Sequence, residues 1–542
     1  MGGKMAPANK FTQLKNHGTV LIVSMIFIAI FSALAVSMAA MSGTSIQLAS
    51  NLHKINSALS AAQSGMECGK YIIANTTLPS TSHNTVTTAE ADAAWNSLCT
   101  QVQNQPWVAG QAQQTATQIT TPGTNFGAAD ALFQVRLTRS GTHEIMLEGI
   151  GNDGQVSREV SISMTITKDR EVLNYAVASR GRMWLTGQST IHGDVFSDWN
   201  RPEISPFNMT SDSAVLGTIN TVLTRNEIES HGYQMETLDS DGNPIDANGL
   251  PLGNNYVDRY YGPSDEIQAY HEGINYGQPN DNMPGMDIAD YNTDEYTTGL
   301  TDIPSCPSGS RELEYFPHAA GNYNYPRDGT PSRTPDRILD RYVYENQTFS
   351  NAKLPSNYNA LFRNCTFEDV LYVDCSKSGS TNYNNVRFEN CTFNGVIVSN
   401  VPQVFKWMHN TLYFTGTATF ENQSSIQEAT VLAPHFNVNL GNTNPTQGEN
   451  NIITGAVIGG IVDVRGNAQV YGTILSMCDT SQWSSGYVSN IGATLDDGGS
   501  ETVEVGDVGV IDITPDKDKM LPSGISSPIV IQPNQNTYSE GI

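Results

Sequence analysis

The sequence predicts a mainly β fold that starts with one long α-helix, continues with a small antiparallel α+β head and ends in a parallel β-solenoid with a long loop-rich insertion. Three observations lead to this prediction. The segment Thr19 to Met41 is apolar and uncharged, residues 133–166 alternate as strands do, and short apolar repeats punctuated by Gly and Asn fill much of the second half. A chain of 542 residues has room for two or three such units.

The composition is acidic, with 28 Lys and Arg residues against 54 Asp and Glu residues and a net charge of −26. This excess of negative charge opposes non-specific binding to nucleic acid, so we expect no nucleic-acid partner. The seven cysteines are too few for a disulfide scaffold and lack the paired spacing of a zinc site.

The run from Thr19 to Met41 is long enough, as a helix, to cross the ~30 Å hydrocarbon core of a membrane. Lys4, Lys10 and Lys15 precede it and no acidic residue does. The positive-inside rule therefore predicts a single-pass membrane protein with residues 1–18 as a cytoplasmic leader and the bulk of the chain periplasmic or extracellular. A signal peptide cut near Ala40 is the alternative, although its apolar region would be unusually long.

The helix is predicted to span 19–75, apolar in its first half and amphipathic in its second. Apolar residues in the second half recur at three- and four-residue steps, with one interruption at Gly69. They are Leu48, Leu52, Ile55, Leu59, Ala62, Met66 and Ile73. A stripe of this kind places one helix face against a folded head.

Two phrases mark this helix. The first, at its start, is His17-Gly18-Thr19-Val20-Leu21-Ile22-Val23, and the second, near its end, is Ser60-Ala61-Ala62-Gln63-Ser64-Gly65-Met66-Glu67. Over about residues 14–75 the chain resembles the PilX-like minor pilins of type IV pili. The resemblance implies prepilin-like processing after Gly18, which would expose Thr19 as the new N-terminus.

Val23 departs from the pattern of major pilins, which carry a glutamate at the fifth position after the cut. PilX-like proteins and tip pseudopilins often lack this acid too. The departure favours a minor, initiating or tip role over a bulk filament subunit, and it leaves open a membrane anchor that never polymerises.

Residues 76–170 are predicted to form the small pilin-like β domain. A helix is expected around 89–102, followed by strands at 133–137, 145–150 and 156–166. Cys68 and Cys99 could clip the long helix to this domain, and their pairing is left open.

The phrase Gly149-x-Gly151-x-x-Gly154 matches a dinucleotide-binding pattern, but another strand follows it instead of a helix. A phosphate would meet no helix N-terminus there, so we interpret the phrase as a turn.

Residues 171–200 are predicted to be a first solenoid coil and 341–480 the main β-solenoid. Gly181–Ser197 matches Gly460–Ser476, with glycines at a six-residue step in both, and Leu412 begins a partial third copy. Short strands punctuated in this way are typical of solenoid coils, each of which must stack on a neighbour to bury its core.

A second pattern places apolar residues at five-residue steps, as at Phe362, Phe367 and Tyr372. This pattern resembles pentapeptide-repeat and other parallel β-helix proteins. The phrase [FY]-x-N-x-[TS] recurs within it and predicts a stacked ladder that satisfies the turn backbone. Its members are Asn346, Asn364, Asn390 and Asn422.

Residues 201–340 are predicted to be an insertion rich in Tyr, Asn and Asp, and 481–542 to form C-terminal strands and a tail. The candidate surface for a glycan or a surface protein is Tyr260, Tyr261, Tyr270 and Tyr276. The alternative, which we favour, is that such tyrosines pack within a capping subdomain.

Sequence motifs for catalysis are missing: there is no H-E-x-x-H, G-x-S-x-G or P-loop. The oxygen ligands Asp239, Asp241, Asn243 and Asp246 alternate as in calcium loops, but Pro244 stands where such a loop needs glycine, so a turn is preferred. We expect no metal and no cofactor.

The expected function is that of a non-enzymatic, membrane-anchored minor pilin-like protein that presents a solenoid for adhesion at the bacterial cell surface, with other pilin-like subunits as partners. The alternative is a polysaccharide-active or polysaccharide-binding β-helix of the envelope, with carboxylates such as Glu368, Asp369 and Asp374 on one face. Cys365 and Cys391 are expected to be buried structural thiols.

Overall fold

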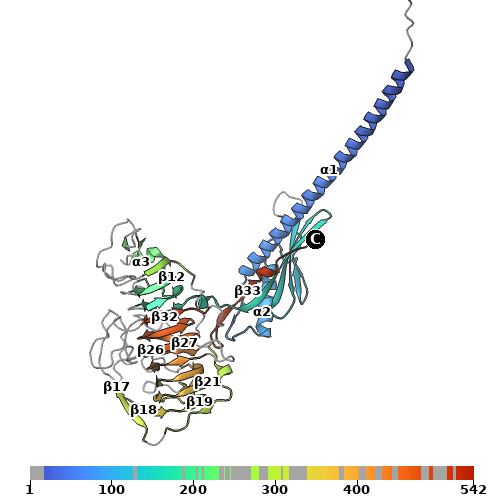
Figure 1. Cartoon of the computed structure of the whole chain (residues 1–542). Helices are drawn as coiled ribbons and strands as arrows, with labels where there is room; N and C mark the ends of the chain where they lie inside the picture. The colour runs from blue at the N-terminus through green and yellow to red at the C-terminus, as the bar shows by residue number, and fades with distance from the viewer. Residues whose placement is uncertain are drawn as a thin grey trace, which may run out of the picture. The chain divides into compact units, whose positions relative to one another are not determined.

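The computed structural model confirms the predicted fold class: the protein is mainly β, with one long N-terminal helix and a large parallel solenoid (Figure 1). It divides into a head, made of residues 1–77, 92–166 and 531–542, and a second unit, made of residues 78–91 and 167–530. The structure describes residues 17–125, 131–185, 189–202, 206–209, 213–230, 237–238, 244–245, 270–279, 283, 291–306, 309–315, 338–376, 384–401, 410–421, 430–441, 450–477, 488–491, 510–516 and 521–541.

Helix α1 (His17–Ala74) is 58 residues long. Of the described helices it is the one long and apolar enough to cross a membrane, and its most apolar stretch is not buried against any part of the protein. Its second half contributes Ala58, Ala62 and Met66 to the head core, whereas Leu48 and Leu52 of the predicted stripe remain exposed. The face that packs on the head therefore starts later than the sequence pattern suggests.

The head is an antiparallel sheet packed on α1. The strands of this sheet run in the order β1-β33-β6-β5-β4-β3-β2, with β34 also paired to β6. Of these, β1 and residues 527–530 of β33 are counted with the second unit. They are β1 (Ser80–Thr81), β2 (Gln113–Gln114), β3 (Gln118–Thr120), β4 (Leu132–Arg139), β5 (Glu144–Asp153), β6 (Val156–Lys168), β33 (Ser527–Pro533) and β34 (Ser539–Gly541). The three predicted strands correspond to β4, β5 and β6, and helix α2 (Thr88–Gln103) corresponds to the predicted helix.

Helix α1 approaches β5 unusually closely because the contact is built from small residues. A Cβ atom at Gly149 or Gly151 would collide with the backbone of α1 at Ala62 or Ala58. The interpretation of the glycine phrase as a turn holds for Gly154, which has φ +62°, but Gly149 and Gly151 lie inside β5. Their role is to admit the helix backbone.

The C-terminal tail returns to the head. Strand β34 pairs antiparallel with β6, with Ser539 opposite Ser161, and the backbone N–H of Asn534 donates to the carbonyl of Ser163 at 2.9 Å. The last strand of the chain thus extends a sheet that is built mainly from residues 113–168.

The second unit is a three-sided parallel β-solenoid. Its strands are β7 (Val177–Ser179), β8 (Arg182–Leu185), β9 (Ser189–Ile191), β10 (Val195–Ser197), β11 (Phe207–Met209), β12 (Ala214–Thr221), β15 (Tyr270–Asn275), β16 (Thr301–Asp302), β17 (Arg311–Tyr315), β18 (Ile338–Glu345), β19 (Thr348–Leu354), β20 (Ala360–Arg363), β21 (Thr366–Val373), β22 (Asn385–Glu389), β23 (Thr392–Ser399), β24 (Thr411–Thr415), β25 (Thr419–Phe420), β26 (Val431–Gly441), β27 (Asn451–Thr454), β28 (Val457–Arg465), β29 (Ala468–Tyr471), β30 (Ile474–Ser476), β31 (Val488–Ile491) and β32 (Ile511–Thr514). Short elements outside the coils are α3 (Arg225–Ser230), β13 (Thr237–Leu238) and β14 (Pro244–Ile245).

The register of these strands defines three faces. Face A contains β18, β20, β22, β24, β31, β8, β11 and the second parts of β26 and β28. Face B contains the first parts of β19, β21, β23 and β12, with β25, β27, β29, β32 and β9. Face C contains the second parts of β19, β21, β23 and β12, the first parts of β26 and β28, and β30, β7 and β10.

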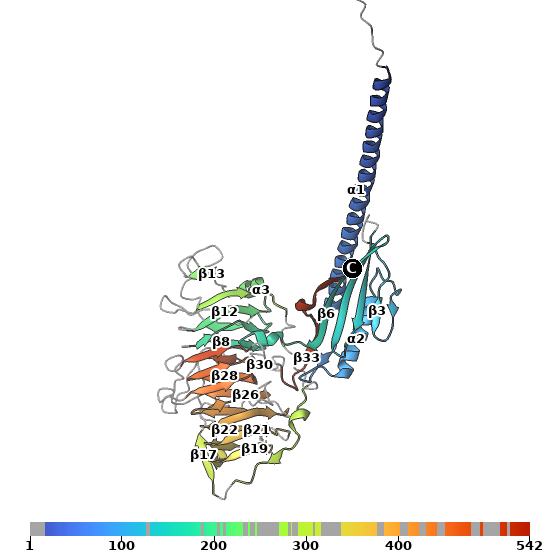
Figure 2. The same ribbon diagram turned by 45° about the vertical axis from the view of Figure 1, so that its right-hand side comes forward.

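The order of coils along the solenoid differs from the order of the sequence. The chain enters at β7 and runs through β10 and β12 to β15 at one end, then starts again from β18 and returns through β28 to β32, which lies beside β9. Figure 2 shows strands of the early run, such as β12 and β8, stacked above strands of the late run, such as β28 and β26.

Two runs of the chain therefore meet at a seam inside the solenoid. Strand β30 pairs with β7, β31 with β8 and β32 with β9. One coil at this seam is composite, because β31 and β32 form its first two sides and β7 forms the third. The backbone N–H groups of Arg180 and His192 donate across the seam to Ser476 and Ile513, at 2.9 and 2.7 Å.

The predicted insertion at 201–340 contains solenoid strands, which the sequence pattern does not reveal. Strands β11, β12 and β15 fall inside that range and belong to coils, and β17 pairs antiparallel with β18 at the opposite end. The solenoid also extends beyond residue 480, through β31 and β32.

The interior is filled by stacked aromatic rings. Phe362, Phe388 and Phe414 on face A lie 5.5 and 5.1 Å apart between successive ring centroids. A second stack, on face B, continues through Phe367 and Phe393 with centroids 5.1 Å apart. The five-residue pattern of large apolar residues thus marks inward positions on two faces of the same core.

Candidate functional site

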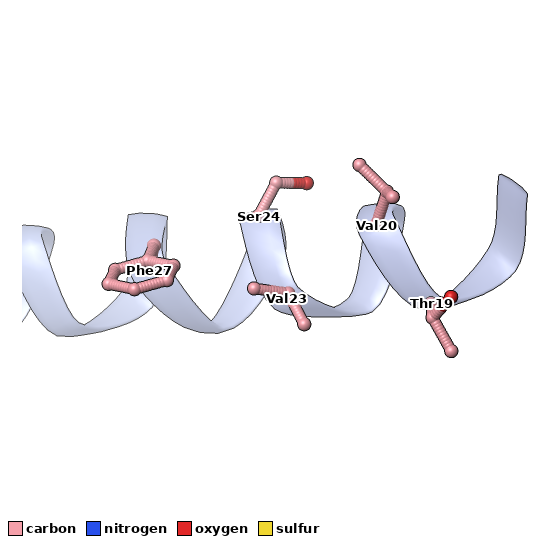
Figure 3. Close-up of a pocket in the computed structure, with 5 residues that line it drawn as sticks. All are labelled: Thr19, Val20, Val23, Ser24 and Phe27. Carbon is pink, nitrogen blue, oxygen red and sulfur yellow. The ribbon is translucent and has the colours of Figure 1, made fainter. Parts of the chain in front are cut away.

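The start of α1 presents an uninterrupted apolar surface. Figure 3 shows Thr19, Val20, Val23, Ser24 and Phe27 along the first turns of the helix, where they line a shallow, open groove. The Ser24 hydroxyl donates to the carbonyl of Leu21 at 2.8 Å, so this side chain satisfies its own polar group inside the helix. A helix surface of this kind is more stable in contact with lipid or with other apolar protein surfaces than in water.

The predicted processing residues lie at the beginning of this helix. Gly18 and Thr19 both fall within α1, which begins at His17. Val23 is one turn beyond Thr19, and 51% of its surface is exposed. No acidic side chain occupies the first turn of α1.

Three predicted ladder residues occupy equivalent corners of the solenoid. Asn346, Asn364 and Asn390 have φ values of 53°, 49° and 54° and follow strands β18, β20 and β22. Each lies where the chain turns from face A to face B, and the N–H of Asn364 donates to the carbonyl of Glu389 in the next coil at 2.9 Å. Asparagine is one of the few non-glycine residues that tolerate this left-handed conformation.

Asn422, the fourth predicted member, lies outside the described residues. The strand register shows which residue takes the equivalent corner in the next coil. Phe414 pairs with Phe388 on face A, whereas Phe420 pairs with Phe393 on face B. The corner that follows Phe414 is formed by Gly416, with φ +67°. The same phrase at Phe420 therefore belongs to a different side of the coil.

The candidate tyrosines do not form a described site. Tyr260 and Tyr261 lie outside the described residues, and of Tyr270 the structure describes only the backbone, in edge strand β15. Tyr276 is partly buried and packs against the solenoid core. Another tyrosine of the same region, Tyr291, is inserted against face C, where its hydroxyl donates to the carbonyl of Ser399 at 2.7 Å.

The candidate metal ligands Asp239, Asp241, Asn243 and Asp246 also lie outside the described residues. The strands that flank them, β13 and β14, pair antiparallel. Within the part of the chain that the structure describes, no group of three or more His, Cys, Asp or Glu side chains could hold a metal ion.

The carboxylates considered for catalysis occupy different environments. Glu368 is exposed on face B, and Asp369 is at the corner between faces B and C, where it accepts from the Ser350 hydroxyl at 3.0 Å. Partial burial favours the protonated form of Asp374, but hydrogen bonds from Ser376, Lys353 and Asn400 hold its pKa well below the usual range. Asp374 is thus an ionised group engaged in a structural network.

The described cysteines are free thiols, including Cys68 and Cys99. Burial raises the pKa of Cys99 to about 11 and also raises that of Cys68. Cys365 and Cys391 are each 1% exposed and face the core. Burial also raises the pKa of Cys391, whereas a hydrogen bond with Cys391 lowers the pKa of Cys365; the burial of both side chains is that of structural thiols.

The outward side chains of face C are covered, whereas those of face A are covered only in part, since Arg363, Arg387 and Glu389 remain partly exposed. On face A, Leu361, Asn439 and Asp463 are at most 1% exposed. On face C, the outward residues Val398, Leu432 and Ile458 are fully buried, and Tyr291, Leu521 and Ile525 pack in the same cluster.

Face B is different, because its outward side chains are exposed or partly exposed. One column is in register across eight coils and consists of Thr348, Thr366, Thr392, Thr419, Ile452, Gln469, Asp512 and Thr190. A second column lies two residues further along each strand and consists of Ser350, Glu368, Asn394, Glu421, Thr454, Tyr471, Thr514 and His192. None of these sixteen side chains is buried.

The sequence signal for this surface was the Thr in the recurrent [FY]-x-N-x-[TS] phrase. Thr348, Thr366 and Thr392 are its final residues, and each precedes an inward Phe. A Thr-Phe dipeptide recurs in four successive coils, the fourth at Thr419-Phe420, and marks an outward hydroxyl beside an inward ring.

Comparisons with known proteins give little further information. No family model and no curated protein matches this sequence. Among solved structures, the competence-associated pilin ComZ from Thermus thermophilus is similar over 90% of this chain and 97% of its own, at 10% identity and a TM-score of 0.26. A TM-score this low does not establish a common fold.

Proposed function

We propose that the protein is a membrane-anchored, exported, pilin-like structural protein whose α1 inserts in the membrane and whose solenoid is displayed outside the cytoplasm. One observation carries this proposal: a single helix is exposed and apolar in its first half and packs on an antiparallel head in its second half. The bare first half needs lipid or other apolar helices around it.

The finer part of the proposal concerns the kind of pilin. Val23 gives the helix no acid with which to pair the terminal amine of a neighbouring subunit, and this supports a minor or tip position, as in the PilX-like resemblance. The role is non-enzymatic in this proposal. Two observations support a non-enzymatic role: Asp374 is held by hydrogen bonds from neighbouring residues, and the Cys365 and Cys391 thiols are buried in the core.

Determination of the mature N-terminus tests the proposal. We expect intact-mass and N-terminal sequencing of the exported protein to show Thr19 as the first residue, and Gly18→Val to leave the leader attached. The control is Ala40→Val, which should leave the cut unchanged. A mature N-terminus near Ala40 would indicate a cleaved signal peptide instead of prepilin-like processing. If neither the wild type nor Gly18→Val is cut, the helix is an unprocessed membrane anchor.

Membrane attachment is tested separately by deletion of Thr19 to Met41. The shortened protein should move from the membrane fraction to the soluble fraction. Retention in the membrane would contradict the role of α1 as the anchor.

A further inference from the structure

Face B is an open, regular array of hydrogen-bonding groups. Thr348, Thr366, Thr392 and Thr419 lie in register on adjacent parallel strands, so their hydroxyls repeat at about the 4.8 Å spacing of a sheet. In the described part of the chain, no hydrogen bond joins these four hydroxyls to another protein group. A row of unused donors and acceptors with a constant period suits a ligand that is itself periodic.

The chemistry of both columns narrows the class of ligand. Neither column contains Lys or Arg, while Glu368, Glu421 and Asp512 supply negative charge. A polyanion would be repelled along the whole face. The other polar side chains are hydroxyls, amides and one imidazole, and hydroxyls and amides hydrogen-bond to neutral hydroxyl groups. The imidazole, that of His192, already pairs with Asp512, with Nε2 and Oδ1 3.1 Å apart.

Apolar surface is present in the same columns. Tyr471 is 49% exposed, and its ring lies in the column next to that of Ile452, which is partly exposed. An amphipathic ligand with apolar ring faces and polar edges can use both kinds of contact. Sugar rings have this character.

The length of the array favours an extended polymer over a small molecule. The register runs without interruption from β19 to β9 and includes the seam, where Asp512 pairs with Thr190. Seven spacings between eight strands amount to roughly 34 Å. A flat surface of this length offers no enclosed pocket for a small ligand.

We propose that face B binds an extended neutral polysaccharide, which lies along the solenoid axis and contacts one threonine or equivalent residue per coil. This proposal goes beyond the proposed function because it concerns only the solenoid. It holds whether or not α1 is processed or enters a filament.

The test uses the full chain in detergent micelles, with microcrystalline cellulose and chitin as insoluble probes in sedimentation assays. The wild-type protein should be retained by at least one of them, with little change between about 0.05 and 0.5 M NaCl, since no charge pair is involved. The triple variant Thr366→Val, Thr392→Val and Thr419→Val should bind at least tenfold more weakly. Valine keeps the shape and the strand preference of threonine, so the coils should remain folded.

The matched control is Thr165→Val, an exposed strand threonine of the head, which should bind like the wild type. A second variant, Thr366→Lys with Thr392→Lys, should abolish retention by blocking the face. Circular dichroism and the melting temperature verify that each variant is folded.

Several outcomes would overturn the proposal. They are no retention of the wild type by either probe, equal retention of the wild type and the triple valine variant, and binding restricted to a polyanion such as polygalacturonate in affinity electrophoresis. Self-association of the wild type that disappears in the triple variant would show instead that face B joins two copies of this chain.

Discussion

At the residue scale, the solenoid depends on side chains that allow the backbone to turn. Asn346, Asn364 and Asn390 take left-handed conformations at equivalent corners, and Gly416 takes the same conformation in the next coil. A second corner, between faces B and C, uses Asn351 and Asp369 with φ values of 45° and 62°. The identity of these residues follows from the conformation that the corner imposes.

Lys168 is a buried residue for which the sequence gives no signal. Its Nζ donates to the carbonyl oxygens of His83, Pro522 and Ile525, so one ammonium group ties together segments far apart in the sequence. The side chain is 5% exposed in total. Burial lowers its pKa to about 7, while the more distant carboxylates of Glu90 and Glu295 act in the opposite direction.

This lowered pKa predicts a pH dependence of stability. The unfolded chain keeps Lys168 protonated up to about pH 10.4, whereas the folded protein releases the proton near pH 7. Between these values the unfolded state binds more protons, so this group makes the free energy of unfolding rise with pH, by up to about 1.4 kcal/mol per pH unit. As the pH falls through 7, the folded protein also binds the proton, and the stability gained at higher pH is lost.

Denaturation of the full chain in detergent at pH 7, 8 and 9 checks this prediction. Lys168→Met should remove most of the rise with pH, and Lys54→Met, on an exposed part of α1, should retain it. His83 and Glu90 form a nearby pair with atoms 3.1 Å apart, so His83→Gln separates their contribution from that of Lys168. An identical pH profile for Lys168→Met and the wild type would contradict the assignment.

At the scale of single elements, the contact between α1 and β5 depends on glycine. Gly149 and Gly151 face Ala58 and Ala62, and on the helix Gly65 comes close to the carbonyl of Gln134. These small residues let two backbones approach, which buries Met66 and Ile73 beside them. Close backbone packing therefore contributes to the attachment of the second half of α1 as much as burial of apolar side chains does.

Gly151→Val should loosen this contact. The added side chain meets the α1 backbone, which cannot move aside as a flexible side chain can, so overpacking of about 1–3 kcal/mol is expected. Hydrogen exchange should become faster over residues 58–73 of α1. Gly43→Ala is the control, because a Cβ there meets nothing within 4 Å and should leave exchange in the head unchanged.

Much of this element structure is visible in the sequence. Strands β4, β5 and β6 follow from alternation, and the Asn corners from a recurrent phrase. The assignment of Asn422, which lies outside the described residues, stays a prediction. The phrase at Phe420 has the same local pattern as those at Phe362 and Phe388, but Phe420 occupies face B, where it pairs with Phe393. A local pattern cannot distinguish two faces of a coil that bury the same residue type.

The order of coils could not be predicted, because parallel pairing between remote segments has no local signature. Val177 pairs with Ile474, almost 300 residues later in the chain. The sequence match between Gly181–Ser197 and Gly460–Ser476 did contain the relevant information. These two segments are equivalent coils, separated in space by the composite coil of the seam.

At the scale of the whole molecule, the seam makes the last part of the chain essential for closing the solenoid. Strand β31 joins β28 to β8, and β32 joins β29 to β9. Without them, the pairing of β30 with β7 is the remaining described link between strands of the two runs. The inward residues Ile491, Ile511 and Ile513 are at most 1% exposed, so their loss also opens the core.

Truncation after Ser476 should therefore uncouple the two runs, while truncation after Asp516 should not. Both shortened chains lack β33 and β34 of the head, so the comparison between them isolates the effect of β31 and β32. We expect calorimetry of the longer chain to show one transition for the solenoid, and that of the shorter chain to show two transitions or a lower melting temperature. Hydrogen exchange should be faster in β8 and β9 of the shorter chain, because these strands lose their neighbours. Identical melting and exchange in both chains would mean that the composite coil does not join the two runs, and that each run folds independently of the seam.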